Sequence, residues 1–184
     1  MKKILLLVLA VLLISNLSFC QNGKFTKKGQ TEIIASISFA STTPVLDGVS
    51  GKSTSTFTLA PYVGYFITDG FELGLGAGIT SQSGSYGSTT YAFVLAPAYN
   101  FNTKSILYPY VQGEIGYNSI NYSGSGTYSG LIWGFEGGLK INIAGNALLK
   151  FGLNYDQYTQ NIDGISGRSG SNVFTAFGGI GLFL

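Results

Sequence analysis

Two glutamates, Glu114 and Glu136, could in principle support acid–base catalysis, because glycoside hydrolases use such a pair of carboxylates. The chain has no histidine, which removes the usual general base and the commonest metal ligand. A buried charge is costly unless it is paired. The sequence therefore favours a structural ion-pair network over catalysis, and we expect no catalytic residue and no enzyme. The network is predicted to comprise Glu72, Glu114, Glu136, Lys140 and Lys150.

Other residues that could hold a ligand have unsuitable spacing. Oxygen ligands for a metal ion could come from Asp47, Asp156 and Asp163, but their spacing matches no known metal-binding loop. The glycines within 74–78 recur at every second position and no helix follows, unlike a phosphate-binding loop. We expect neither a metal ion nor a cofactor.

The composition indicates the class of protein that carries these residues. Only 10% of the residues are charged, whereas 45% are hydrophobic and 14% aromatic, and there are 27 glycines. Soluble domains usually contain roughly a quarter charged residues. After residue 14 no segment is apolar over the ~20 residues that a spanning helix needs. These features favour strands in a membrane.

Residues 1–20 are typical of a secretory signal peptide, with two lysines before the apolar segment Ile4–Ile14. Small residues near the end predict cleavage between Cys20 and Gln21. An uncleaved anchor is disfavoured because the apolar segment is short. A lipidated Cys20 is disfavoured because the bulky Phe19 precedes it. Cleavage would leave no cysteine, since the sequence has one, and would exclude disulfides.

A leader, residues 21–30, is expected between the signal peptide and the barrel, which we assign to residues 31–184. The leader contains the one basic cluster of the chain, Lys24, Lys27 and Lys28. We expect these side chains to be solvated, and the chain has no basic stripe that would indicate nucleic-acid binding.

Beyond the leader, apolar and polar residues alternate with a period of two, which predicts strands. The runs are longer than most globular strands and match tilted strands that cross a bilayer. Short turns at 68–70, 102–105 and 144–146 alternate with longer links at 42–55, 81–89, 119–129 and 158–172. Tight periplasmic turns and longer outer loops are typical of an up-and-down membrane barrel. The eight predicted strands are 31–41, 56–68, 71–80, 90–101, 106–118, 130–143, 147–157 and 173–184.

The two faces of each run indicate which side of the barrel meets lipid. In run 71–80, apolar residues such as Leu73 and Leu75 share one face, and Glu72 lies with glycines on the other. A lipocalin-like barrel keeps apolar side chains inside, whereas a membrane barrel has a polar lumen. Charges within the strands favour the membrane barrel. Pairing about Gly145 would place Lys140 opposite Lys150.

Aromatic residues of the outward parity are predicted to form two belts at the bilayer interfaces. The loop-end belt comprises Phe57, Tyr91, Phe93, Tyr117, Trp133, Tyr155 and Phe174. The turn-end belt comprises Tyr65, Phe71, Tyr99 and Phe101.

Two groups of residues fit the strands poorly. Prolines within a strand remove a ladder donor, so we expect bulges or earlier strand ends at Pro61, Pro97 and Pro109. Bulky rings with the inward parity require facing glycines or local bulges. These rings are Tyr62, Phe66, Tyr108, Tyr110, Phe177 and Phe183.

The segment 60–76, APYVGYFITDGFELGLG, resembles the second-strand, turn and third-strand unit of the bacterial outer membrane protein beta-barrel domain family, which is similar to OmpA/OmpX-type barrels. The last strand resembles the carboxy-terminal assembly signal of such proteins, with Ile180, Leu182, Phe183 and Leu184 as its residues. The resemblance implies a Gram-negative outer-membrane location, a transmembrane antiparallel β-barrel of about eight strands, and no definite activity.

The leading functional hypothesis is a non-enzymatic barrel with a structural or surface-interaction role. Alternatives are a narrow channel or transporter for a small solute, and an adhesin that binds through its loops, where Tyr122, Tyr128 and Tyr158 lie. A secreted lipocalin-like protein is the rival fold. Expected partners are outer-membrane lipid and lipopolysaccharide, and, during biogenesis, periplasmic chaperones and the barrel-assembly machinery.

Overall fold

The computed structural model of the 184-residue chain describes residues 25–42, 45–46, 49–50, 52–84, 87–103, 105–124, 126–161 and 168–184. The expected signal peptide, with Cys20 and Gln21, lies outside the described residues, as do Asp47 and Asp163. Within the described ranges, no helix is both long enough and apolar enough to cross a membrane.

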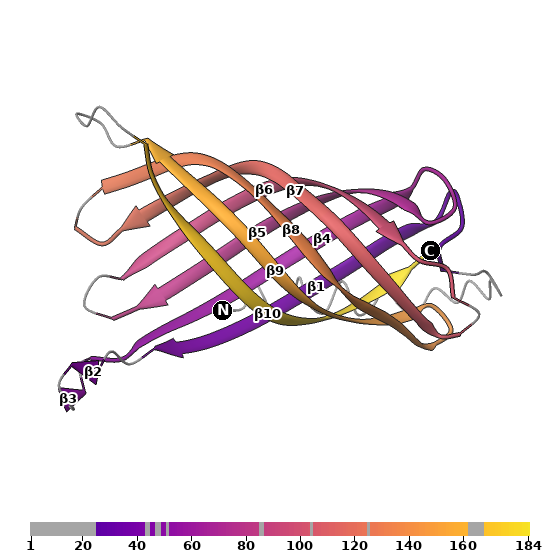
Figure 1. The fold of residues 1–184 in the computed structure, drawn as a ribbon, viewed down its shortest axis with the longest axis horizontal. Coiled ribbons are helices and arrows are strands. Elements are labelled where there is room, and N and C mark those ends of the chain that lie inside the picture. Colours follow the sequence, from indigo (N-terminus) through magenta and orange to yellow (C-terminus); the bar gives the residue numbers. More distant parts are fainter. Residues whose placement is uncertain are drawn as a thin grey trace, which may run out of the picture.

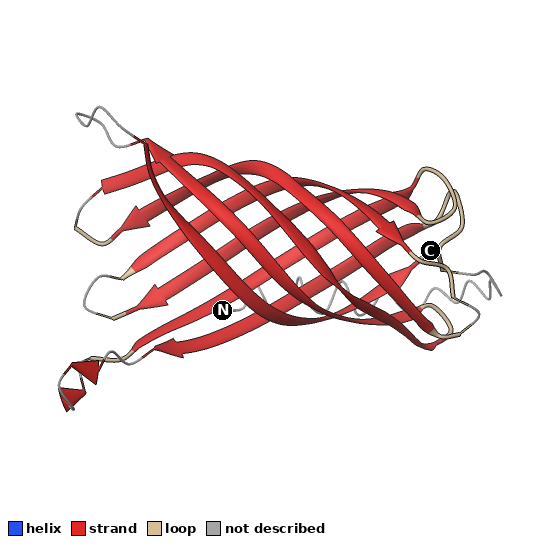
Figure 2. Cartoon of the chain, in the orientation of Figure 1, coloured by secondary structure: helices blue, strands red, loops and turns tan. Residues whose placement is uncertain are grey.

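The described chain folds into a closed antiparallel barrel of eight long strands, which confirms the predicted fold class (Figures 1 and 2). Sequential strands pair around the barrel, and the first strand closes it against the last. The barrel strands are β1 (Thr31–Thr42), β4 (Thr54–Phe66), β5 (Phe71–Ser83), β6 (Ser88–Asn100), β7 (Leu107–Tyr122), β8 (Gly126–Ala144), β9 (Ala147–Asn161) and β10 (Arg168–Phe183).

Each predicted run coincides with one barrel strand, and the differences lie mainly at the loop end. The β7–β8 ladder continues from Ser119↔Ser129 to Tyr122↔Gly126, into a segment predicted as a loop. The polar composition of this segment masked the ladder, because it lacks the apolar face from which the other strands were predicted. The link before β4 also contains a small hairpin of β2 (Val45–Leu46) and β3 (Val49–Ser50).

The expectation that the three strand prolines mark bulges or earlier strand ends is wrong. Pro61 faces Ala35 and Pro97 faces Leu73 within continuous registers, and Pro109 faces Leu139 near the start of β7, in a continuous β7–β8 register. On the other side of β4, the β4–β5 ladder lacks the pairs of Ala60 and Pro61 and then resumes in the same register. The β6–β7 ladder likewise lacks the pairs of residues 96 and 97 and resumes in the same register. A strand residue directs its N–H to one neighbour only, so Pro61 and Pro97 each interrupt one ladder and leave the other intact, whereas the β6–β7 ladder ends beside Pro109.

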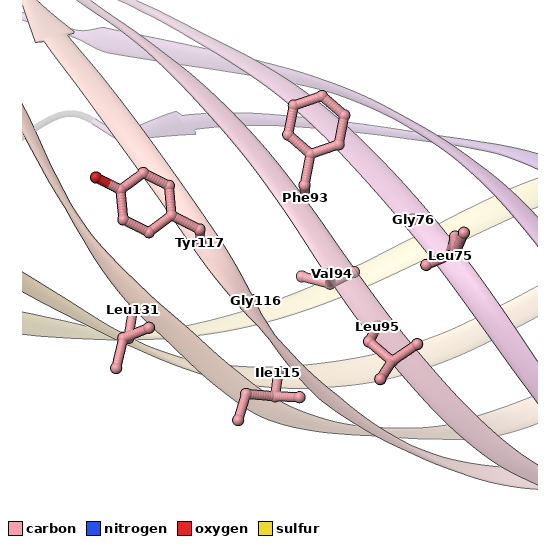
Figure 3. A pocket seen from close by; sticks show the side chains of 9 residues that line it. All are labelled: Leu75, Gly76, Phe93, Val94, Leu95, Ile115, Gly116, Tyr117 and Leu131. Atoms are coloured by element: carbon pink, nitrogen blue, oxygen red, sulfur yellow. The ribbon is translucent and has the colours of Figure 1, made fainter.

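The alternation of side chains is that of a membrane barrel. On β5, Glu72 and Gly74 are buried in the lumen, whereas Leu73 and Leu75 are exposed on the outside. Figure 3 shows apolar side chains around a shallow depression of the outer wall. The depression is lined by Leu75, Phe93, Leu95, Ile115, Tyr117 and Leu131, with Gly76, Val94 and Gly116 between them.

Candidate functional site

A buried lysine joins opposite walls of the lumen near the turn end of the barrel. Lys140 Nζ of β8 lies 2.5 Å from an Oε2 of Glu32 on β1 and 3.0 Å from Oε2 of Glu72 on β5, and all three side chains are completely buried. Glu72 also accepts hydrogen bonds of 2.9 Å from Tyr62 Oη and from Asn100 Nδ2. A buried charge with this many partners is compensated rather than left as a destabilising defect.

A second ion pair lies one layer closer to the loops. Lys150 Nζ contacts Glu136 Oε1 at 2.7 Å, and Tyr110 Oη donates a 2.7 Å hydrogen bond to the same oxygen. The ammonium also lies 4.8 Å from the centre of the Tyr110 ring, a cation–π distance. Lys140 and Lys150 face each other across β8 and β9. Their separate carboxylates keep the two facing lysines compensated.

The structure brings four of the five predicted network residues into these two groups and places Glu114 elsewhere. Glu114 accepts a 2.8 Å hydrogen bond from Gln112 Nε2 and has no ion pair among the described residues. Glu32 was not assigned to the network, although its position in the first strand gives it the inward parity. Its pairing with Lys140, 108 residues away, depends on how the closed barrel aligns its walls.

The leader closes the turn end of the lumen. The Phe25 ring is fully buried. Its centre lies 5.2–5.3 Å from the centres of the Phe66, Tyr108 and Phe183 rings. Its segment is fixed by hydrogen bonds from Gly29 N to Phe66 O and from Gly70 N to Thr26 O, both 2.8 Å. No signal in the sequence indicated this packing of the leader. The predicted solvation of the basic cluster agrees with the exposed side chains of Lys27 and Lys28, and Lys24 lies outside the described residues.

Glycines on the facing strands make room for the bulky inward rings, as one of the two sequence alternatives proposed. A Cβ atom on Gly74 would lie 2.1 Å from Tyr62 Oη. A Cβ on Gly152 would lie 2.5 Å from Tyr110 Oη and 2.8 Å from the Phe177 ring. These glycines allow bulky side chains from nearby strands to fill a narrow lumen.

The loop-end half of the lumen is hollow. A cavity of about 730 Å³ is lined by hydroxyl and amide side chains, by the charged groups of Glu114, Glu136, Lys150 and Asp156, and by apolar side chains. Side chains thus fill only the turn-end half of the interior. Tyr158, predicted in a loop, belongs to β9 and lines this cavity.

The other predicted residues lie on the outer wall and at the last strand. All predicted belt aromatics have exposed side chains, but their height in a bilayer remains a prediction. On β10, Ile180 is 62% exposed and Leu182 half-buried, and the final Leu184 is exposed. Phe183 points into the lumen and is 2% exposed, so the terminal aromatic contributes to the turn-end packing.

The chain matches no protein-family model and no curated protein. Solved structures do resemble it. Neisserial surface protein A is 15% identical, with a TM-score of 0.60 over 84% of this chain and 97% of that protein. The N-terminal β-barrel domain of OprF from Pseudomonas aeruginosa is 21% identical, with a TM-score of 0.57 over 85% of this chain and 98% of the domain. The chain therefore has the fold of the eight-stranded outer-membrane β-barrels, which confirms the resemblance inferred from its sequence.

Proposed function

We propose that the chain is a non-enzymatic, non-conducting integral protein of a Gram-negative outer membrane, with a structural or surface-interaction role exercised at its loop end. In this proposal, export removes residues 1–20. Periplasmic chaperones and the barrel-assembly machinery then insert the barrel into outer-membrane lipid and lipopolysaccharide. The apolar outer wall and the polar lumen support insertion.

The closure of the lumen at its turn end is the observation that carries the proposal. A solute that moved along the axis would have to displace Phe25 from its ring cluster and then separate Lys140 from two carboxylates. Eight-stranded barrels have interiors just wide enough for side chains to fill. This favours a closed scaffold over the channel alternative.

Conductance tests the proposal. The purified chain, refolded in detergent and shown to be a barrel by a heat-dependent shift in gel mobility, is added to planar lipid bilayers. We expect no stable channel. Phe25→Ala is measured beside it as a variant that is more prone to conduct, because it lacks the ring at the centre of the turn-end cluster. A stable, porin-sized conductance from the unmodified chain would contradict the proposal.

Adhesion through the loop end is a second candidate, supported by an aromatic pair. Tyr122, at the end of β7, and Tyr128, at the start of β8, pack edge to face with their ring centres 5.7 Å apart. Replacing both with serine removes the two rings. The backbone pairs of the hairpin, such as Ser119↔Ser129, are not altered by the replacement. A non-adherent host that displays the unmodified chain should gain cell or matrix binding. A host that displays the double variant should not. Equal binding by both would exclude a role for this pair.

A further inference from the structure

The wall of the barrel is incomplete at one seam. The β1–β10 ladder runs from Glu32↔Phe183 to Ile37↔Gly178 and extends no further in the described residues. Beyond it, β1 pairs only with β4, and residues 168–177 of β10 pair only with β9. Figure 1 shows the two strands diverging toward the loop end from where they meet. Every other pair of neighbouring barrel strands has a longer ladder.

The loop-end cavity reaches this seam. Its lining includes residues of both diverging edges, among them the apolar side chains of Ile37, Phe39, Phe174 and Ala176. These four have the outward parity, whereas most other lining residues face the lumen. The cavity is therefore open to the side between β1 and β10, and the rim of that opening is apolar.

The seam lies at the level of the loop-end aromatic belt. Phe39 pairs with Phe57, and Phe174 pairs with Tyr155, and both partners belong to that belt. Aromatic belts mark the boundary between hydrocarbon and water. A molecule in this opening would have one part in a polar cavity and another against lipid chains, so the site suits an amphiphile.

The charged side chains of the cavity indicate which head group the amphiphile would carry. Three carboxylates, of Glu114, Glu136 and Asp156, line it together with one ammonium, of Lys150. Because Lys150 is paired with Glu136, the other two carboxylates are left without an ion pair in the described part of the chain. The cavity lining therefore holds more carboxyl groups than ammonium groups, an arrangement that favours a cationic ligand.

Unsatisfied acceptors point to the same chemistry. Gln112 is 5% exposed and Asn154 is 9% exposed, and both side chains line the cavity. Among the described residues, Gln112 Oε1, Asn154 Oδ1 and Asp156 Oδ1 have no hydrogen-bond donor. A buried acceptor without a donor has lost its hydrogen bonds to water and destabilises the fold. All three atoms are acceptors, so a ligand that carries N–H or O–H groups complements this part of the cavity wall.

We propose that the cavity and the seam together bind a single-chain amphiphile with an ammonium head group. The head lies among Glu114, Asp156 and the acceptors of Gln112 and Asn154, and the apolar chain leaves through the β1–β10 seam. An organic cation is favoured over a metal ion because no cluster of three or more His, Cys, Asp or Glu suited to a metal occurs in the described chain. The proposal goes beyond a scaffold role and does not require conduction.

Saturable binding to the chain in lipid nanodiscs, corrected for empty nanodiscs, tests the proposal. The probes are dodecylammonium, dodecanoate with the same chain and opposite charge, and putrescine with ammonium groups and no long chain. Dodecylammonium is expected to bind at least tenfold more tightly than either of the others. Equal binding of dodecanoate, or no saturable dodecylammonium binding, would overturn the proposal.

Two sets of variants locate the ligand. Replacing Glu114 with Gln and Asp156 with Asn should weaken dodecylammonium binding at least tenfold. Asp69→Asn, at an exposed turn at the opposite end, removes a comparable charge and should leave binding unchanged. Replacing Phe39 and Phe174 with serine should weaken dodecylammonium several-fold and leave putrescine unaffected. A heat-dependent shift in gel mobility shows that each variant is folded. Unchanged dodecylammonium binding in both sets of variants would overturn the assigned site.

Discussion

The two halves of the lumen are built on the same strands yet differ in how they are filled. At the turn end, Glu72, Lys140 and the Phe25 ring cluster occupy the interior completely. At the loop end, the inward positions of β5 are small, such as Gly78 and Thr80, and a cavity of about 730 Å³ remains. The alternation of residues thus determines the wall, and the size and charge of the inward residues determine whether the lumen is closed.

This difference also separates two kinds of charge. The turn-end charges are completely buried and form ion pairs with one another across the barrel. Glu114 and Asp156, by contrast, line a cavity and have no ion pair in the described residues. The first set should matter mainly for stability, and the second set mainly for what the cavity binds.

The largest loss of stability is expected for Lys140→Met. The variant leaves Glu32 and Glu72 buried without a cation, and breaking a buried ion pair in this way costs about 3–5 kcal/mol. Urea unfolding in lipid vesicles measures it. Lys150→Met is the matched variant and should cost less, because its partner Glu136 borders the cavity and can be hydrated. Equal losses would remove the distinction between the halves.

Phe25→Ala should have the next largest effect. Truncating a buried phenylalanine costs about 3 kcal/mol or more in a packed core, and this ring contacts three others. The same unfolding experiment applies. Lys27→Ala, at an exposed position of the same segment, should change the free energy of unfolding by less than about 0.5 kcal/mol. A neutral Phe25→Ala would show that the leader does not close the barrel.

Two glycines of β5 compare the halves directly. Gly74→Ala would place a Cβ 2.1 Å from the hydroxyl of Tyr62, which is held by its hydrogen bond to Glu72. We expect a loss of about 1–3 kcal/mol from overpacking. Gly78→Ala meets only Ala92 Cβ, at 3.7 Å, and should be nearly neutral. A larger loss of stability for Gly78→Ala than for Gly74→Ala would mean that the filled and hollow halves are misassigned.

The smallest stability effect is expected for Asp156→Asn. Its carboxylate has no ion pair in the described chain and lines the cavity, so removing its charge breaks no ion pair and should lower the free energy of unfolding by no more than about 0.5 kcal/mol. Thermal unfolding followed by gel shift measures this. A loss comparable with that of Lys140→Met would make Asp156 part of the structural network.

The strands, their faces and the opposition of Lys140 to Lys150 could be predicted because they depend on alternation and on turn positions, which are local. The burial of Phe25 could not, since a short leader without periodicity gives no signal of where its ring packs. The pairing of Glu32 with Lys140 depends on the closure of the whole barrel. The seam also escaped prediction, because it results from where the β1–β10 ladder ends.

Thiol accessibility tests the asymmetry of the lumen most directly. Single cysteines replace Thr90, which lines the cavity, and Ala98, which is 2% exposed near the turn end of the same strand. The background carries Cys20→Ser, and a small, water-soluble thiol reagent is applied to the folded chain in lipid. The account predicts rapid labelling of Thr90→Cys and none of Ala98→Cys until the barrel is unfolded. Rapid labelling of both in the folded state would contradict a lumen that is filled at the turn end and hollow at the loop end.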